Sequence, residues 1–233
     1  MNTEAIILAG GFGTRLKSVV HDVPKPMAPV AGKPFLYYIL NYLQNQGIKR
    51  TILSVGYKRE IITGYFGNKF RDISIGYATE DTPLGTGGGI LNALRKCTEK
   101  QVFIVNGDTF FPVPLNELHD KHIYTQAETT IALKQIDDPG RYGTVCLNSN
   151  SFITSFKEKN ESSASLINGG IYLVDRPKIE SRKFNDIFSF EKDYLEQVVK
   201  ECCIAGCIFS HYFLDIGIPE SYRQAQKEML QFV

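Results

Sequence analysis

The chain has 233 residues, of which 43% are hydrophobic and 22% are charged, and its formal net charge is +1. This composition is typical of a folded globular protein with a sizeable core, and the near-neutral charge argues against nucleic-acid or membrane partners. The sequence shows no membrane span and no signal peptide, so we expect a cytoplasmic protein that binds small molecules. The five cysteines are odd in number and form no CxxC pair, which indicates reduced thiols rather than disulfides or a zinc site.

The first predicted element is a strand over residues 5–9, AIILA, because a short continuous apolar run is typical of a strand buried on both faces of a parallel sheet. Gly10, Gly11 and Gly13 follow, and glycines let the backbone turn sharply and bring its N–H groups close to a bulky ligand. Arg15 comes two residues after the last glycine, which suits an anion such as a phosphate. An ordinary tight turn with a surface arginine stays open as the alternative.

Two familiar glycine motifs do not fit this loop. The dinucleotide fingerprint requires a third glycine where the chain has Leu16, and a later acidic residue for the ribose, whereas residues 23–59 hold no Asp or Glu. A P-loop requires Gly-Lys followed by Ser or Thr, which does not occur here. The carboxylate-free stretch is instead rich in basic residues, as a polyanionic small ligand would favour. Lys25 stands out in it because prolines on both sides fix its backbone.

From residue 34 to residue 134, predicted helices alternate with predicted strands. The helices are 34–47, which Gly47 ends, and 88–98, and the strands are 51–57, 73–78, 102–108 and 129–134. This alternation is typical of βαβ units, in which a parallel sheet carries helices on both faces. Asp108 lies at the C-terminal edge of one of these strands, where open α/β sheets bind their ligands.

Beyond residue 140 the pattern changes to sheet segments separated by turns. We expect sheet at 142–148, 152–159 and 168–174, a flexible loop at 160–165, and helices at 191–201 and 219–230. Asp215 follows an apolar run in this half, and two aspartates with phosphate oxygens form a natural Mg²⁺ site. Either aspartate alone is equally typical of a turn or a helix cap.

These pieces together resemble a known family. LAGGFGTRL, PKPM, LGTGGG, NGD and a late DIG, spread from Ala5 to about Ala225, are similar to the motifs of sugar-1-phosphate nucleotidyltransferases. The resemblance implies a three-layer, Rossmann-like (GT-A-like) α/β fold with a mixed, mostly parallel sheet flanked by helices. It also implies a reaction in which a nucleoside triphosphate and a sugar 1-phosphate give a nucleotide sugar and pyrophosphate, with Mg²⁺ as the cofactor.

The resemblance also implies roles for individual residues. Arg15, Lys25 and Asp108 are the implied catalytic residues, and Asp108 and Asp215 the implied metal ligands. The implied nucleotide-binding residues are Leu8, Ala9, Gly10, Gly11, Gly13, Thr14, Arg15, Lys25, Glu80, Gly85, Thr86 and Asp108. The implied sugar-phosphate-binding residues are Tyr142, Gly143, Glu158, Lys159, Asn168 and Gly169. We expect one domain over residues 1–233, with a nucleotide-binding half at about 1–135 and a sugar-phosphate-binding half at about 136–233.

The implied chemistry needs few further groups. The attacking phosphate oxygen is already anionic at neutral pH, so the reaction requires positioning and charge stabilisation rather than a general base. The four histidines therefore need no catalytic role.

Glu80 bears on which nucleotide binds. A carboxylate only accepts hydrogen bonds, and guanine offers two adjacent donors, so Glu80 favours GTP. Gly87, Gly88 and Gly89 are expected to leave room for a purine, while Asp81 or backbone groups are alternative readers of the base.

Further likeness in TRLKSVV, RYGTV and FLDIGIPESY implies D-glycero-α-D-manno-heptose 1-phosphate as the sugar substrate, for bacterial surface glycan synthesis. Mannose 1-phosphate stays open as an alternative, as does uridylyl or thymidylyl transfer to another sugar 1-phosphate. A function of a different class also stays open, because the fold serves in non-catalytic proteins that bind nucleotide sugars. Such proteins usually lose an equivalent of Arg15, Lys25 or an aspartate, and this chain retains them all. Homo-oligomerisation stays open as well.

Overall fold

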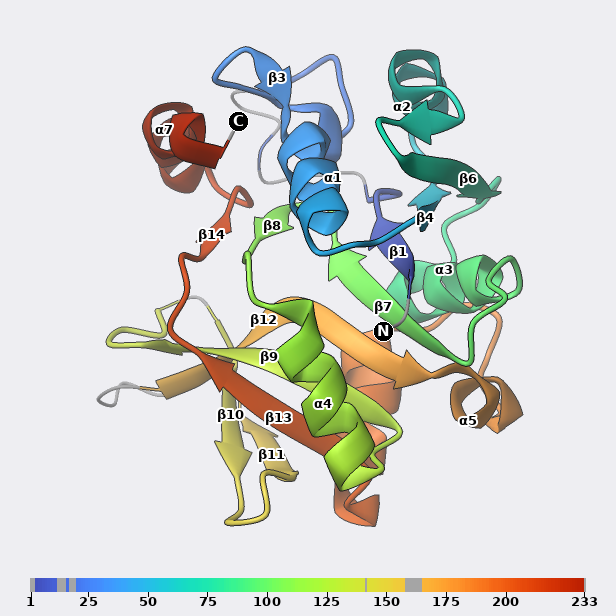
Figure 1. Cartoon of the computed structure of the whole chain (residues 1–233), viewed down its shortest axis with the longest axis vertical. Coiled ribbons are helices and arrows are strands. Elements are labelled where there is room, and N and C mark those ends of the chain that lie inside the picture. Colours follow the sequence, from blue (N-terminus) through green and yellow to red (C-terminus); the bar gives the residue numbers. More distant parts are fainter. Residues whose placement is uncertain (1–2, 12–15, 17–19, 141, 158–164, 233) are drawn as a thin grey trace.

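The computed structural model describes residues 3–11, 16, 20–140, 142–157 and 165–232, and its centre is a mixed β-sheet (Figure 1). The main path through this sheet runs β11-β10-β12-β7-β1-β4-β6-β5, with β9 paired to β12 and β13 paired to β9. The strands of the sheet are β1 (Glu4–Leu8), β4 (Arg50–Val55), β5 (Lys69–Phe70), β6 (Ile73–Thr79), β7 (Gln101–Asn106), β9 (Thr129–Ile136), β10 (Thr144–Leu147), β11 (Ile153–Lys157), β12 (Ser165–Asp175) and β13 (Ile204–Phe209).

The central strands are parallel, as the alternating pattern predicts. β7, β1, β4 and β6 are parallel neighbours. Beyond these parallel strands, β12 from the second half of the chain lies antiparallel to β7, and β9 lies antiparallel to β12. Strands from both halves of the chain therefore share one sheet, and the prediction of a mixed sheet is confirmed.

Helices cover both faces of the sheet. They are α1 (Phe35–Asn45), α2 (Arg59–Phe66), α3 (Gly85–Leu94), α4 (Leu115–Thr125), α5 (Arg176–Ser181), α6 (Glu196–Val198) and α7 (Pro219–Glu228), with a π-helical turn η3 (Phe190–Leu195) and 3₁₀ turns η2 (Lys25–Met27), η4 (Val199–Glu201) and η5 (Met229–Phe232). Ala5 and Ile7 of β1 pack into a core with α1, α4 and α7, whereas Ile6 packs into a second core with α3 and η3. All three side chains are fully buried, which confirms the predicted strand with two buried faces.

Some element boundaries differ from the sequence predictions. The helix predicted over 88–98 begins at Gly85 and ends at Leu94, because residues 95–97 continue as a tighter turn in which Cys97 N–H donates to the Leu94 carbonyl. No element was predicted for β13, α2 or α4. Residues 160–164 of the predicted loop lie outside the described residues, and Ser165 begins β12.

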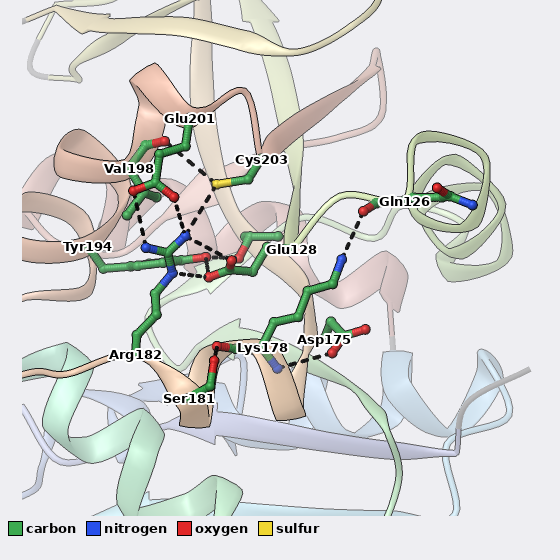
Figure 2. Close-up of polar contacts among 11 residues, drawn as sticks. Gln126, Glu128, Asp175, Lys178, Ser181, Arg182, Tyr194, Val198, Glu201 and Cys203 are labelled. Carbon is green, nitrogen blue, oxygen red and sulfur yellow. Dashed lines mark hydrogen bonds and ion pairs between the residues drawn. The ribbon is translucent and has the colours of Figure 1, made fainter.

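An ion network fastens the segment that follows α5 to the start of β9 (Figure 2). Arg182 donates to Glu128 across 2.5 Å and to Glu201 across 2.6 Å, and the Tyr194 hydroxyl donates to Glu128 across 2.8 Å. These hydrogen bonds raise the pKa of Arg182, so the guanidinium stays charged beside the buried Glu128. Because η3 lies between Arg182 and Glu201 in the chain, the network fixes where η3 sits.

The cysteine prediction is confirmed, since all five thiols are free. Burial raises the pKa of Cys97 to about 12 and that of Cys203 to about 11. Within the described ranges, no three His, Cys, Asp or Glu residues gather to hold a metal ion. No helix of the described chain has both the length and the apolarity to cross a membrane.

Candidate active site

A cavity of about 430 Å³ lies at the carboxyl ends of β1, β4, β6 and β7. Parallel strands end together at this edge, which is where open α/β sheets bind ligands. The predicted site residues in its walls are Leu8, Gly10, Gly11, Lys25, Glu80, Gly85, Thr86 and Asp108. Ala9, by contrast, is buried and continues the sheet, because its N–H donates to the Ser54 carbonyl across 2.8 Å.

Lys25 and Asp108 form an ion pair in this cavity, with 2.5 Å between Nζ and Oδ2. The short turn η2 carries Lys25, and Pro24 before it is extended, as the flanking prolines predict. The Lys25 side chain is only 10% exposed, whereas that of Asp108 is 34% exposed. The ammonium is therefore held at a fixed place, and its charge acts where water screens it little.

A small two-stranded sheet brings the second aspartate beside the first. In it, β8 (Thr109–Phe110) pairs with β14 (Leu214–Asp215), so that Asp215 stands opposite Thr109. The Gly217 N–H donates to Asp215 Oδ1 across 2.5 Å, and a methyl group on Gly217 would lie 3.2 Å from Lys25 Nζ. The structure thus brings Lys25, Asp108 and Asp215 together. Two carboxylates beside an ammonium group fit a hard cation whose other ligands are phosphate oxygens.

Glu80 stands in another wall of the cavity, held by two hydrogen bonds. Ser54 Oγ donates to its Oε1 across 2.9 Å, and the Leu84 N–H donates to its Oε2 across 3.2 Å. Each carboxylate oxygen still has a lone pair for a ligand donor. Asp81 has a different position, because its side chain is 87% exposed and pairs with Arg59 across 2.8 Å. It lines a neighbouring cavity of about 320 Å³, not the one that holds Lys25.

The expectation that Gly87 and Gly88 leave room for a purine is wrong, whereas Gly89 lines the cavity. A β-carbon on Gly87 would lie 2.1 Å from the ring of Phe188, and one on Gly88 would lie 2.8 Å from the Asp186 carbonyl oxygen. One on Gly89 would lie 2.7 Å from Glu80 Oε1. The space beside Gly87 and Gly88 is filled, so these two glycines let residues 186–188 pack against α3, whereas Gly89 lets Glu80 lie close to α3 in the cavity wall.

The described residues of the predicted sugar-phosphate set do not line this cavity. The Asn168 amide donates to the Tyr172 hydroxyl across 2.9 Å, and its oxygen accepts from the Gly170 N–H across 2.9 Å. Gly169 is buried, and a β-carbon there would lie 2.4 Å from the ring of Phe111, which indicates a packing role. Tyr142 packs edge-on against the Phe213 ring at 5.7 Å, next to the exposed Gly143.

Five predicted site residues lie outside the described residues: Gly13, Thr14, Arg15, Glu158 and Lys159. Conversely, the structure places in the cavity wall several residues that the sequence analysis did not single out: Pro26, Ser54, Pro83, Asn106, Gly107, Glu191 and Gly217. Asn106 and Gly107 adjoin Asp108, so the NGD motif carried a signal for them. Glu191 is distant in sequence from every predicted nucleotide-binding motif, and no local pattern marks it.

Comparison with known proteins adds independent findings. The family model described as "Nucleotidyl transferase" matches residues 4–231. The D-glycero-alpha-D-manno-heptose 1-phosphate guanylyltransferase of Aneurinibacillus thermoaerophilus is 50% identical over 230 residues, which cover 99% of this chain and 100% of the relative. A protein of the same name from Campylobacter jejuni is 46% identical over 94% of this chain and 96% of its own length. The crystal structure of HddC from Yersinia pseudotuberculosis complexed with GMP-PN is similar with a TM-score of 0.87 at 35% identity, covering 98% of this chain and 100% of that one.

Proposed function

The chain belongs to the nucleotidyl transferase family, and on that basis we propose that it transfers a guanylyl group from GTP to D-glycero-α-D-manno-heptose 1-phosphate, releasing pyrophosphate. The observation that carries this proposal is the shared cavity. One space joins the Lys25–Asp108 pair, suited to phosphates, to the Glu80 carboxylate, suited to a base with adjacent donors. The chain is similar along its full length to two proteins named D-glycero-alpha-D-manno-heptose 1-phosphate guanylyltransferase, and this similarity supports the choice of both substrates.

The reaction joins two phosphates and breaks one bond. A phosphate oxygen of the sugar 1-phosphate attacks the α-phosphorus of GTP, and the bond from that phosphorus to the pyrophosphate oxygen breaks. The nucleophile carries no proton that must be removed, so this chain has to position both anions and stabilise charge. Lys25 provides a fixed ammonium for the α-phosphate, and Gly10 and Gly11 provide backbone N–H groups beside it. We assign Gly13, Thr14 and Arg15 to the outer phosphates of GTP, and Lys159 to the phosphate of the sugar.

Enzymes of this family typically use a divalent metal ion. We propose that Asp108 and Asp215 hold Mg²⁺ together with phosphate oxygens, since the pairing of β8 with β14 and the hydrogen bond from the Ile216 N–H to the Asp108 carbonyl bring the two residues next to each other. When bound, Mg²⁺ screens the repulsion between the two phosphates and polarises the bond that breaks.

Glu80 reads the base in this proposal. Its two oxygens, oriented by Ser54 and Leu84, accept hydrogen bonds from guanine N1–H and the 2-amino group. Uracil and thymine present one donor between two acceptors, and those acceptors would face the carboxylate unfavourably. Glu158 and Asn168 are assigned to hydroxyls of the sugar.

Pyrophosphate release tests the proposal. GTP, UTP, dTTP, CTP and ATP are each combined with D-glycero-α-D-manno-heptose 1-phosphate, mannose 1-phosphate or glucose 1-phosphate, with Mg²⁺ or with EDTA. We expect strong release only with GTP, the heptose phosphate and Mg²⁺. Preference for mannose 1-phosphate or for a pyrimidine nucleotide would overturn the substrate assignment. Nucleotide binding without release from any pair would identify a non-catalytic binding protein instead.

A further inference from the structure

Glu191 is a carboxylate in the cavity wall for which the reaction described above has no use. It comes from η3, in the second half of the chain, and reaches the glycine turn that begins α3. Thr86 Oγ1 donates to Glu191 Oε2 across 2.7 Å, and Ser189 Oγ donates to the same oxygen across 3.0 Å. Both hydrogen bonds from described residues therefore end on Oε2, which leaves Oε1 as the acceptor for a ligand.

The backbone around Glu191 is built to keep the carboxylate there. The Gly87 N–H donates to the Phe188 carbonyl across 3.0 Å, the Phe188 N–H donates to the Leu84 carbonyl across 3.1 Å, and the Phe190 N–H donates to Thr86 Oγ1 across 2.9 Å. Gly85 has a φ of +75°, and a β-carbon there would lie 2.4 Å from the Phe188 carbonyl oxygen. The glycine turn and the segment that leads into η3 thus form one rigid wall.

Electrostatics restricts what Glu191 can bind. Both proposed substrates are anions, and a carboxylate in the cavity repels phosphates, so the phosphates belong at the Lys25 end. An ionised carboxylate only accepts hydrogen bonds, so the group that Glu191 binds must be a donor. The adjacent donors of guanine are assigned to Glu80, and the donors that remain on the two substrates are sugar hydroxyls.

Glu191 lies between Thr86, an implied nucleotide-binding residue that donates a hydrogen bond to it, and side chains of the second half of the chain, where we expect the sugar 1-phosphate to bind. The nearby Tyr172 hydroxyl accepts from Asn168, which we assign to the sugar. Phe190, the residue before Glu191, packs edge-on against the Tyr172 ring with 5.3 Å between the ring centroids, so the backbone that carries Glu191 lies next to Tyr172. Asn106, whose side chain also bonds to Tyr172, lines the cavity together with Glu191.

We propose that Glu191 Oε1 accepts a hydrogen bond from a hydroxyl of the glycosyl ring of the sugar 1-phosphate, which makes Glu191 a specificity-determining residue. This inference rests on the proposed function, because it needs a sugar 1-phosphate as substrate. Thr86 and Ser189 act as positioning residues, since they orient the carboxylate through Oε2.

Steady-state kinetics with each substrate varied in turn tests the proposal. For Glu191→Ala we expect the KM for the heptose 1-phosphate to rise about 10- to 100-fold, as for loss of a hydrogen bond to a charged group, while the KM for GTP changes less than about twofold. Glu191→Gln keeps a hydrogen-bond acceptor, so we expect a smaller rise in the KM for the heptose 1-phosphate. The matched control is Glu196→Gln, which removes the same charge from an exposed position one turn further along the same helical segment.

The outcomes separate this inference from the proposed function. A heptose 1-phosphate analogue that lacks the bound hydroxyl should show the same KM with the wild type and with Glu191→Ala, which would support the proposal. The proposal would be overturned if Glu191→Ala raised both KM values equally, raised only the KM for GTP, or changed neither. Inactivity of the wild type would instead overturn the proposed function.

Discussion

Lys25 and Asp108 neutralise each other inside the cavity, with 2.5 Å between the ammonium nitrogen and a carboxylate oxygen. Lys25 is almost buried, whereas Asp108 keeps about a third of its surface exposed at 34%. A bound phosphate must therefore share the ammonium with Asp108 or replace that carboxylate. A divalent cation on Asp108 would favour that exchange, because the carboxylate then has a stronger partner than the lysine.

Replacing Lys25 should affect the chemical step most. Lys25→Met keeps most of the length of the side chain but removes its charge, so we expect kcat for pyrophosphate release to fall about 100-fold or more. Lys49→Met is the control, since Lys49 is exposed and lies in the same basic stretch outside the cavity. Thermal unfolding of both variants checks that they fold. Equal kcat values for the two variants would contradict the role of Lys25.

Replacing Glu80 should change which nucleotide is used. For Glu80→Gln we expect kcat/KM with GTP to fall about 100-fold, because the amide turns a donor toward guanine. ITP lacks the 2-amino group of GTP, so we expect the same substitution to lower kcat/KM with ITP by a smaller factor. Asp81→Asn is the control, because Asp81 is exposed and lines only the neighbouring cavity. A larger loss in Asp81→Asn than in Glu80→Gln would make Asp81 the reader of the base.

Local patterns in the sequence predicted the parts of the structure that depend on local contacts. The apolar run before Gly10 marked β1, and the residues after buried strands marked Asp108 and the cavity edge. The order of strands was not predictable, because β12 inserts beside β7 through pairing between Ile171 and Val105, more than sixty positions apart. The packing of Gly87 in α3 is unpredictable for the same reason. Its neighbour is Phe188, and no local pattern shows which distant side chain will fill the space beside a glycine.

The packing of Phe188 on Gly87 can be tested by adding a methyl group. Gly87→Ala places a β-carbon 2.1 Å from the present position of the Phe188 ring, so we expect the free energy of unfolding to fall by about 1–3 kcal/mol. Adding Phe188→Ala should make room, so the double variant should lose less than the sum of the single losses. Gly64→Ala in α2 is the matched control, because nothing lies within 4 Å of its β-carbon position, and it should stabilise the protein by about 0.5–1 kcal/mol. Urea denaturation measures the wild type and all four variants, and strict additivity of Gly87→Ala and Phe188→Ala would contradict the contact.

His122 should make the protein less stable in mild acid. Its side chain is buried in α4, its Nδ1 lies 2.8 Å from Thr130 Oγ1, and burial lowers its pKa from 6.5 to about 4. Between these two values the unfolded chain binds a proton that the folded protein does not, so the free energy of unfolding falls as the pH drops below about 6.5. From neutral pH to about pH 5 we expect this one group to remove about 2 kcal/mol. Urea denaturation across this range should show a flatter pH dependence for His122→Gln, whereas His21→Gln, at an exposed position, should follow the wild type. If the free energy of unfolding depended on pH in the same way in the wild type and in His122→Gln, the interpretation of His122 as a buried neutral imidazole would be wrong.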